Sequence, residues 1–168
     1  MQTRVLIHTL VLVISILALT TACSDPDGPS RSDPDGHISY RLIGDWEAVP
    51  GSSETRFKPV SNNRVEMQIN TVAKSRGGLA RQRDVWLDAQ RRSGAEVFYS
   101  EDWQTPHFQG VAYGHSAEGM MGPFHWHHIV LEGENFVIAS HLQVPPDAPD
   151  DWLSTYRDIV ASIQPAAP

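Results

Sequence analysis

The chain has 168 residues, a formal net charge of −7 and a single cysteine. This length suits one domain of ordinary size. One cysteine excludes an intramolecular disulfide framework, a cysteine-based zinc finger and an iron–sulfur cluster. The excess of acidic over basic residues, 20 against 13, argues against nucleic-acid binding, which needs surplus cations. With 40% apolar residues the chain can still build a core.

Residues 1–22 have the pattern of a bacterial secretion signal. Arg4 supplies a positive charge near the N-terminus, and residues 5–19 are mostly apolar. About 15 residues at ~1.5 Å each span roughly 22 Å, which is short of the ~30 Å hydrocarbon core of a bilayer. A cleaved signal peptide therefore fits better than a permanent transmembrane helix.

The lone cysteine, Cys23, directly follows the predicted signal peptide. Residues 19–23 (LTTAC) resemble the lipobox of bacterial lipoproteins, although Thr20 stands where such boxes most often carry Leu. The resemblance implies that Cys23 becomes the N-terminus and carries a diacylglyceryl group and an N-acyl chain such as palmitate. Each buried CH₂ contributes ~0.8 kcal/mol, so that two or three chains anchor a protein firmly to a membrane. The alternative is a plain secretory signal followed by an incidental cysteine.

The residue after the cysteine bears on the choice of membrane. Ser24 follows Cys23, and Asp first appears at position 25. By resemblance to enterobacterial sorting, this implies the cell outer membrane, with the protein facing the periplasm.

Residues 23–37 are predicted to be the lipidated cysteine and a flexible acidic tether. The pentapeptide SDPDG occurs at 24–28 and at 32–36, and no large apolar residue lies between Ser24 and His37. Such a composition cannot offset the entropy of ordering. A calcium loop is the alternative, but Pro separates the carboxylates and no bidentate Glu follows, unlike an EF-hand. The globular domain is predicted at residues 38–165.

Six strands and one helix are predicted before the last segment of the domain. The first two strands lie at 55–59 and 64–72, the second because apolar and polar residues alternate. A helix over 79–92 follows Gly78, and Gly94 is placed as its C′ residue. Four further strands are expected at 96–100, 109–116, 124–131 and 136–144, with hairpin connections at 117–122 and 133–135.

A second helix ends the domain. Its apolar residues recur at helical spacing and form one face: Trp152, Tyr156, Ile159, Val160 and Ile163. Asp150 and Asp151 stand at its start, where carboxylates are favoured by the helix dipole. This order of elements predicts an α+β fold, a mostly antiparallel sheet flanked by helices.

The same order resembles the PsbP-like fold shared by photosystem II extrinsic proteins and bacterial DcrB-type lipoproteins. The segments that carry the resemblance are 44–50 (GDWEAVP), 56–59 (RFKP), the helix around Trp86, 122–140 (GPFHWHHIVLEGENFVIAS) and 162–165 (SIQP). The resemblance implies an α/β/α sandwich and mostly non-enzymatic roles in binding, assembly or envelope maintenance. The family has no shared catalytic residues to assign here.

Histidines are concentrated in the second half of the domain. Alternation along 124–131 places His125 and His127 on one face of a strand and His128 on the other. If the hairpin sets residue 131 opposite 137, His127 faces His141, and His115 can approach from the preceding strand. Imidazoles so arranged can bind Zn²⁺, Cu²⁺ or Ni²⁺. The alternative is that they are half-buried strand residues, and a register slip of one residue removes His141 from the set.

Signatures of hydrolases are absent from the sequence. There is no G-x-S-x-G elbow and no Walker loop, and Ser140 and His141 are adjacent in a strand and so point to opposite faces. Glu132 and Glu134 are expected to form an exposed acidic turn. Trp103 lies beside Glu101 and Asp102 in a stretch without clear periodicity, where it is either core or a protein-contact residue.

These features predict a membrane-anchored, periplasm-facing lipoprotein that acts as a non-enzymatic binding or interaction module of the cell envelope, in one version a toxin-immunity lipoprotein. The alternative is a periplasmic lipoprotein that binds a transition metal through its strand histidines. The expected partners are the membrane, through Cys23, and a protein. No cofactor, catalytic residue or nucleic-acid partner is predicted.

Overall fold

A computed structural model describes residues 28–51, 55–74, 78–119 and 122–167. The predicted signal peptide and Cys23 lie outside the described residues. No helix within the described ranges is both long enough and apolar enough to span a bilayer.

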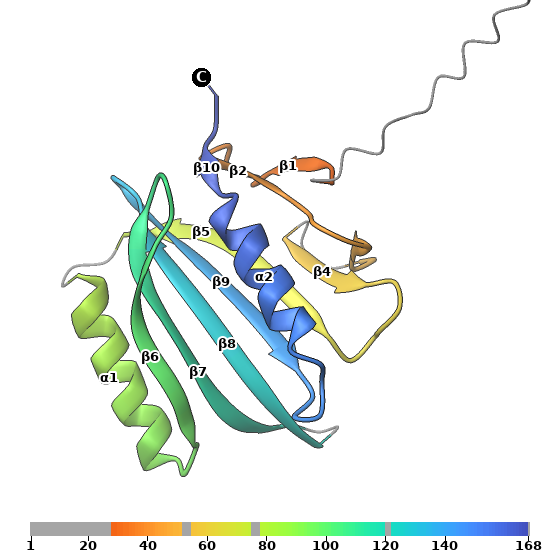
Figure 1. Cartoon of the computed structure of the whole chain (residues 1–168). Coiled ribbons are helices and arrows are strands. Elements are labelled where there is room, and N and C mark those ends of the chain that lie inside the picture. The colour runs from red at the N-terminus through yellow and green to blue at the C-terminus, as the bar shows by residue number, and fades with distance from the viewer. Residues whose placement is uncertain (1–27, 52–54, 75–77, 120–121, 168) are drawn as a thin grey trace, which may run out of the picture.

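Seven strands form one antiparallel sheet in the order β3-β4-β5-β9-β8-β7-β6 (Figure 1). Its strands are β3 (Trp46–Ala48), β4 (Arg56–Pro59), β5 (Glu66–Ala73), β6 (Val97–Gln104), β7 (Gln109–Gly119), β8 (Gly122–Glu132) and β9 (Phe136–Val144). A smaller antiparallel sheet has the order β1-β2-β10. Its strands are β1 (Ser30–Ser32), β2 (Ile38–Arg41) and β10 (Gln164–Pro165).

The two helices, α1 (Leu79–Arg92) and α2 (Asp151–Ala161), pack on opposite faces of the large sheet. In β7, Val111 and Tyr113 pack with Leu87 of α1, whereas Ala112 between them belongs to the cluster that α2 covers. Successive side chains of a strand point to opposite faces, so the helices lie on different sides. The expected α+β fold, with a mostly antiparallel sheet and flanking helices, is confirmed.

The main core lies on the α2 side. Tyr156, Ile159 and Val160 of α2 are fully buried there against Ile129 and Leu131 of β8. Their positions follow the predicted apolar face of the last helix. Burial of such a face is what stabilises a helix of this length, because short helices are marginal by themselves.

The end of α1 follows the prediction from Gly94. Gly94 has φ +88°, its N–H donates to the carbonyl of Arg91, and the N–H of Ala95 donates to the carbonyl of Gln90. This is a Schellman motif, in which the residue after the C-cap adopts the left-handed conformation that glycine tolerates best.

The tether predicted at residues 23–37 includes residues that the structure places in the fold. Ser30, Arg31 and Ser32 pair with β2, and the carboxylate of Asp33 is buried, where it accepts hydrogen bonds from the N–H of Ile38 at 2.8 Å and the hydroxyl of Thr71 at 2.7 Å. Residues 28–37 therefore belong to the fold. Composition predicted disorder because it registers few apolar side chains, whereas this segment is held by backbone pairing and one buried carboxylate.

Candidate functional site

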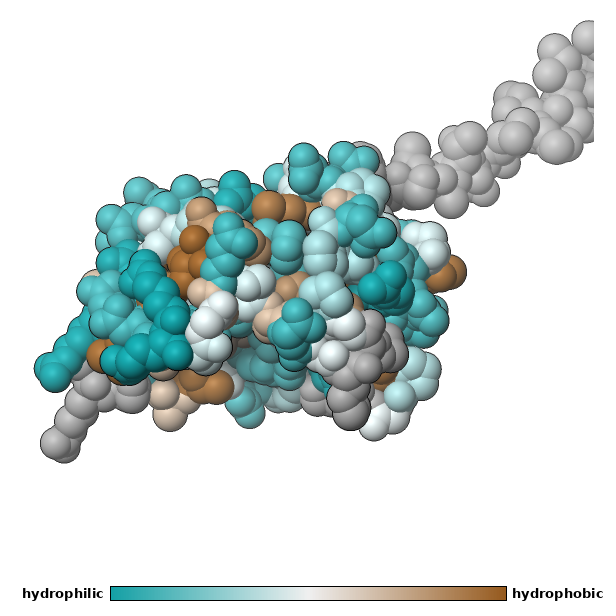
Figure 2. Space-filling model, turned by 90° about the horizontal axis from the view of Figure 1, so that it is seen from below, coloured by the Kyte–Doolittle hydropathy of each residue, from teal (hydrophilic) through white to brown (hydrophobic). Residues whose placement is uncertain are grey.

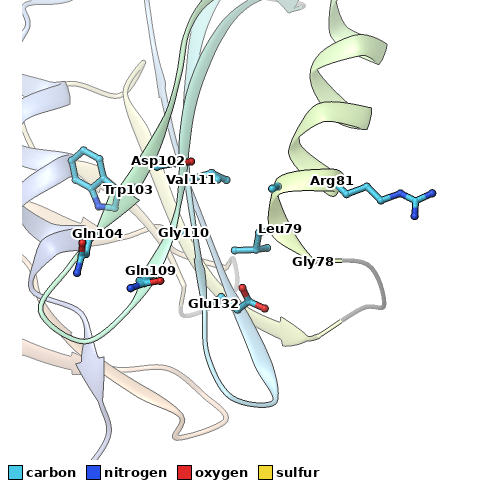
Figure 3. A pocket seen from close by; sticks show the side chains of 11 residues that line it. Gly78, Leu79, Arg81, Asp102, Trp103, Gln104, Gln109, Gly110, Val111 and Glu132 are labelled. Atoms are coloured by element: carbon cyan, nitrogen blue, oxygen red, sulfur yellow. The ribbon is translucent and has the colours of Figure 1, made fainter.

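A cavity lies between the first turn of α1 and the edge of the sheet (Figure 3). Its volume is about 760 Å³, which is within the usual range of ligand sites. It is lined by the N-cap residue Gly78, by Leu79, Ala80 and Arg81 of α1, by Asp102, Trp103 and Gln104 of β6, by Gln109, Gly110 and Val111 of β7, and by Glu132 of β8. We call it the α1 cleft.

The cleft exists because α1 packs loosely. Only Leu79 and Leu87 of this helix are buried, and Val85 is 62% exposed. Gly78 is the N-cap of the helix and provides no side-chain cap for its first backbone N–H groups. The side chain of Arg81 points away from the cleft toward solvent (Figure 3).

The carboxylates that line the cleft are both paired with cations of the domain. Asp102 contacts Arg83 at 3.3 Å, and Glu132 contacts Lys74 at 2.6 Å. Beside these ion pairs, the lining offers amide side chains, backbone groups and apolar surface, which suit the recognition of a partner.

A smaller cavity of about 160 Å³ continues beneath α1 and shares Leu79 and Val111 with the cleft. Trp86, Tyr113 and Val130 complete its apolar walls. Together the two cavities form a path under the N-terminal half of α1.

A cluster of aromatic and imidazole rings lies at the inner end of this path. His128 stacks on Tyr113 with ring centroids 4.8 Å apart and on His115 at 5.4 Å. Trp86 of α1 places its edge against His115 at 4.7 Å and His128 at 5.1 Å. The rings of Trp126 and His141 extend the cluster along the sheet. We call this set the ring cluster: Trp86, Tyr113, His115, Trp126, His128 and His141.

The hydrogen bonds of the ring cluster fix two tautomers. The Nδ1 of His115 lies 2.8 Å from the carbonyl oxygen of Ser116, so that Nδ1 must carry the proton of a neutral ring. Its Nε2 is then an acceptor, and the Nε2 of His128, 3.3 Å away, must be the donor. The pair is satisfied when both rings are neutral.

Burial keeps these rings neutral. It lowers the pKa of His128 to about 3, with smaller contributions from His141, His115 and His127. The pKa of His115 is also lowered by burial, against a raising effect of its bond to Ser116. Burial lowers the pKa of His141 in the same way, although Glu66 acts in the opposite direction.

His127 lies on the other face, among the residues that α2 covers. The Tyr99 hydroxyl and the His127 Nδ1 are 3.1 Å apart. The pKa of His127 is lowered to about 4, chiefly by burial and to a smaller extent by His125, Arg157 and His115. Burial likewise raises the pKa of the Tyr99 hydroxyl. His125 packs at the edge of the sheet against Phe98 at 4.4 Å.

The predicted metal set of His115, His125, His127 and His141 is therefore wrong in its geometry. The hairpin between β8 and β9 closes through a bond from the N–H of Gly133 to the carbonyl of Phe136, which leaves a turn of two residues. His141 consequently pairs with His128, and His127 pairs with Leu142. A slip of one residue moves His141 to the opposite face from His125 and His127.

A group that sequence reasoning did not select does bring potential ligands together. One ligand atom from each of Asp33, Asp35 and His37 lies within 4.8 Å of the others, and no other such group occurs within the described ranges. Both oxygens of Asp33 already accept hydrogen bonds, and His37 stacks on Phe136 at 4.8 Å. The Asp-x-Asp-x-His spacing was visible in the sequence, but the burial of Asp33 depends on Thr71 from β5.

Trp103 lies in β6, partly buried against the main core. The guanidinium of Arg157 sits 5.2 Å from its ring and 5.4 Å from the ring of Tyr99, and donates to Glu101 at 3.0 Å. The exposed-contact alternative for Trp103 is thus not favoured, because the ring is engaged by α2.

Ser140 and His141 point to opposite faces, as their adjacency predicted. The Ser140 hydroxyl is buried and donates to the carbonyl of Ile129, next to the Tyr156 hydroxyl at 2.9 Å. These groups link β8, β9 and α2 and have no access to a substrate.

No known protein family and no curated protein matches the sequence. Solved structures of other proteins have a similar fold. The solution structure of cyanobacterial PsbP (CyanoP) from Synechocystis sp. PCC 6803 superposes with a TM-score of 0.60 at 12% identity, covering 89% of this chain and 98% of that protein. The fold is PsbP-like. A crystal structure from Bacteroides thetaiotaomicron VPI-5482 has a TM-score of 0.56 at 11% identity over 84% of this chain, which spans about half, 49%, of that protein.

Proposed function

We propose that this protein is a lipid-anchored, non-enzymatic binding module of the bacterial cell envelope, held at a membrane through Cys23. The observation that carries the binding role is the α1 cleft, whose volume is about 760 Å³ and whose two lining carboxylates are paired with Arg83 and Lys74. Amides such as Gln104 and Gln109 are the groups it offers to a partner. The PsbP-like fold supports an architecture for binding but transfers no activity.

The anchoring role is supported by the apolar signal and by the LTTAC segment that precedes the domain. The proposed site is the outer membrane, facing the periplasm, because Ser24 follows Cys23. The proposed partner is a protein. The domain from residue 38 to 164 contains more acidic than basic residues, 16 against 11, which favours a basic partner such as a secreted toxin.

The binding role is tested by photo-crosslinking in cells. A benzophenone amino acid replaces Gln109 in the cleft, and a matched variant carries it at Gln68, which lies outside the cleft in β5. We expect a discrete crosslinked product from position 109 and none from position 68. Equal products from both positions, or none from position 109, would contradict binding in the cleft.

The anchoring role is tested separately. Metabolic labelling with palmitate and separation of membranes should place the native chain in the membrane fraction with label. Cys23→Ala should lose both the label and the membrane fraction. Retention of the unlabelled variant in the membrane would contradict anchoring through Cys23.

A further inference from the structure

The two edges of the large sheet differ in length. At one edge β3 has three residues, whereas at the other edge β6 has eight. Within the described ranges, no strand pairs with the outer side of β6 (Figure 1). A long edge strand presents a row of backbone N–H and C=O groups, to which another chain can add a strand. The short β3 offers few such groups.

The register of the β6–β7 hairpin identifies the backbone groups that point outward. It is regular from Tyr99 to Gln104, and beyond it the N–H of Thr105 donates to the carbonyl of Phe108 at 2.9 Å. Pairs along an antiparallel ladder alternate between bonded and non-bonded, so that every second residue before Thr105 bonds to β7: Trp103, Glu101 and Tyr99. The residues between them turn their N–H and C=O groups to the open side: Gln104, Asp102 and Ser100.

The acidic side chains of this stretch point to alternate faces of the sheet. Asp102 contacts Arg83 of α1 at 3.3 Å, whereas Glu101 contacts Arg157 of α2 at 3.0 Å. Figure 3 shows the intervening alternation, with the Trp103 ring on the side of β6 away from α1. In both pairs the carboxylate is the more exposed member, 94% against 19% and 48% against 34%. Exposed ion pairs are weak, so the edge presents one available carboxylate on each face.

The surface near the start of β6 is polar. Figure 2 views the molecule from the end at which α1 ends and β6 begins, and shows a mainly hydrophilic surface with hydrophobic residues in small patches. Recognition at this end therefore depends on backbone groups and charge rather than on a broad apolar surface.

A second copy of this chain is a poor occupant of the β6 edge. In a dimer with two-fold symmetry the two edge strands pair antiparallel, and residues whose backbone groups point outward must meet. The two registers centred on the regular stretch set either Glu101 or Asp102 opposite the same residue of the other copy. Like charges directly opposite each other destabilise a sheet. The same carboxylates favour a strand that carries basic residues.

From this edge and its charge, we infer that β6 binds an extended segment of the protein partner as an added strand, and that the segment has two consecutive basic residues. Consecutive side chains of a strand point to opposite faces, so one basic group meets Asp102 on the α1 side and the next meets Glu101 on the α2 side. Asp102, Trp103 and Gln104 also line the α1 cleft, and the inference rests on the binding role proposed for that cleft. Main-chain hydrogen bonds supply the affinity, and the charges select the partner.

The probe is a capped peptide of about eight residues, with two lysines at its centre and threonine and valine on both sides. It carries a dye and is added to the mature chain in detergent micelles, where fluorescence anisotropy measures its affinity. We expect saturable binding, and binding about ten-fold weaker when glutamates replace the lysines. N-methylation of the backbone along both edges of the peptide keeps its side chains and charge, but should abolish binding because the main-chain donors are lost.

The protein gives an independent readout. The N–H groups of Ser100, Asp102 and Gln104 should exchange with solvent about ten-fold more slowly when the peptide is bound, whereas the residues between them already bond to β7. Ser100→Pro removes one outward N–H and should weaken binding about ten-fold. Ala48→Pro removes an outward N–H from β3 at the opposite edge and should change the affinity by less than about two-fold.

Equal binding of the methylated peptide, unchanged exchange at the three outward positions, or failure of the lysine peptide to bind would overturn the inference. Exchange that slows with protein concentration in the absence of peptide would show pairing with a second copy instead. Crosslinking from Gln109 in cells separates these results from the binding role. A crosslinked product with a failed strand test leaves the cleft as the binding site, whereas no product means that the binding role itself fails.

Discussion

The two faces of the large sheet are packed in different ways. On the α2 face, Tyr156, Ile159 and Val160 are fully buried and Gly114 approaches Tyr99 and His127 without room for a methyl group. On the α1 face, only Leu79 and Leu87 of the helix are buried, two connected cavities remain, and imidazole rings replace much of the aliphatic core. The α2 face provides stability, and the α1 face provides accessible volume.

The largest expected effect compares one buried residue of each helix. Ile159→Ala on α2 should lower the free energy of unfolding by about 2–5 kcal/mol, because a fully enclosed site cannot collapse around the lost methyl groups. Leu87→Ala on α1 should cost less, because the surrounding helix is loosely packed and can relax. Urea unfolding of both variants measures the difference. An equal or larger loss of unfolding free energy for Leu87→Ala would contradict the looser packing of the α1 face.

The second prediction concerns substitutions that enlarge a side chain on each face of the sheet. The Cβ of Gly114→Ala would lie 2.5 Å from the ring of Tyr99, so that this change should cost about 1–3 kcal/mol. Val111→Ile is the matched change on the α1 face, where its added methylene can enter the cavity of about 160 Å³. It should stay within about 1 kcal/mol of the native stability.

The assignment of the Gly114 clash to the Tyr99 ring has its own control. Tyr99→Leu removes the ring, so the double variant with Gly114→Ala should lose less stability than the sum of the two single changes. Additive losses in thermal unfolding would show that the clash lies elsewhere.

A third and smaller effect concerns pH. His128 and His127 have folded pKa values of about 3 and about 4, below the value of about 6.5 in an unfolded chain. The unfolded state therefore binds more protons below pH 6.5, and stability falls as pH drops toward those folded values. Each group contributes at most about 1.4 kcal/mol per pH unit.

Variants measured between pH 7 and 5 check this effect. His128→Phe should reduce the slope while keeping an aromatic ring in the cluster. Burial lowers the pKa of four histidines, and three of them, His115, His128 and His141, lie on the α1 face. As the pH falls, amide exchange should therefore increase in α1 before it increases in α2. The reverse order would contradict the comparison of the two faces.

Regular periodicity carried most of the fold prediction. The bounds of the helix at 79–92 and of the strand at 136–144 were predicted as the structure has them, because helix capping and alternation are local signals. Strands β1, β2, β3 and β10 were missed. They have two to four residues each, which is too short for a period to be recognised.

The candidate site was less accessible to sequence reasoning. Alternation assigned His125, His127 and His128 to their faces of β8, but the partner of His141 depended on whether the hairpin turn has three residues or two. The structure has two, and that difference replaces the predicted set with the ring cluster on the other face. The α1 cleft has no sequence signal, because its volume results from how far α1 stands from the sheet.

The sequence by itself determined an acidic α+β domain, because composition, capping residues and apolar periodicity are properties of neighbouring residues. Tertiary structure decided which histidines meet, where a cavity opens and that residues 28–37 belong to the fold. The segment from 28 to 37 shows the reason most directly. Its own residues are polar and favour disorder, but pairing with β2 and the hydrogen bond between Asp33 and Thr71, which are 38 residues apart, hold it in the fold.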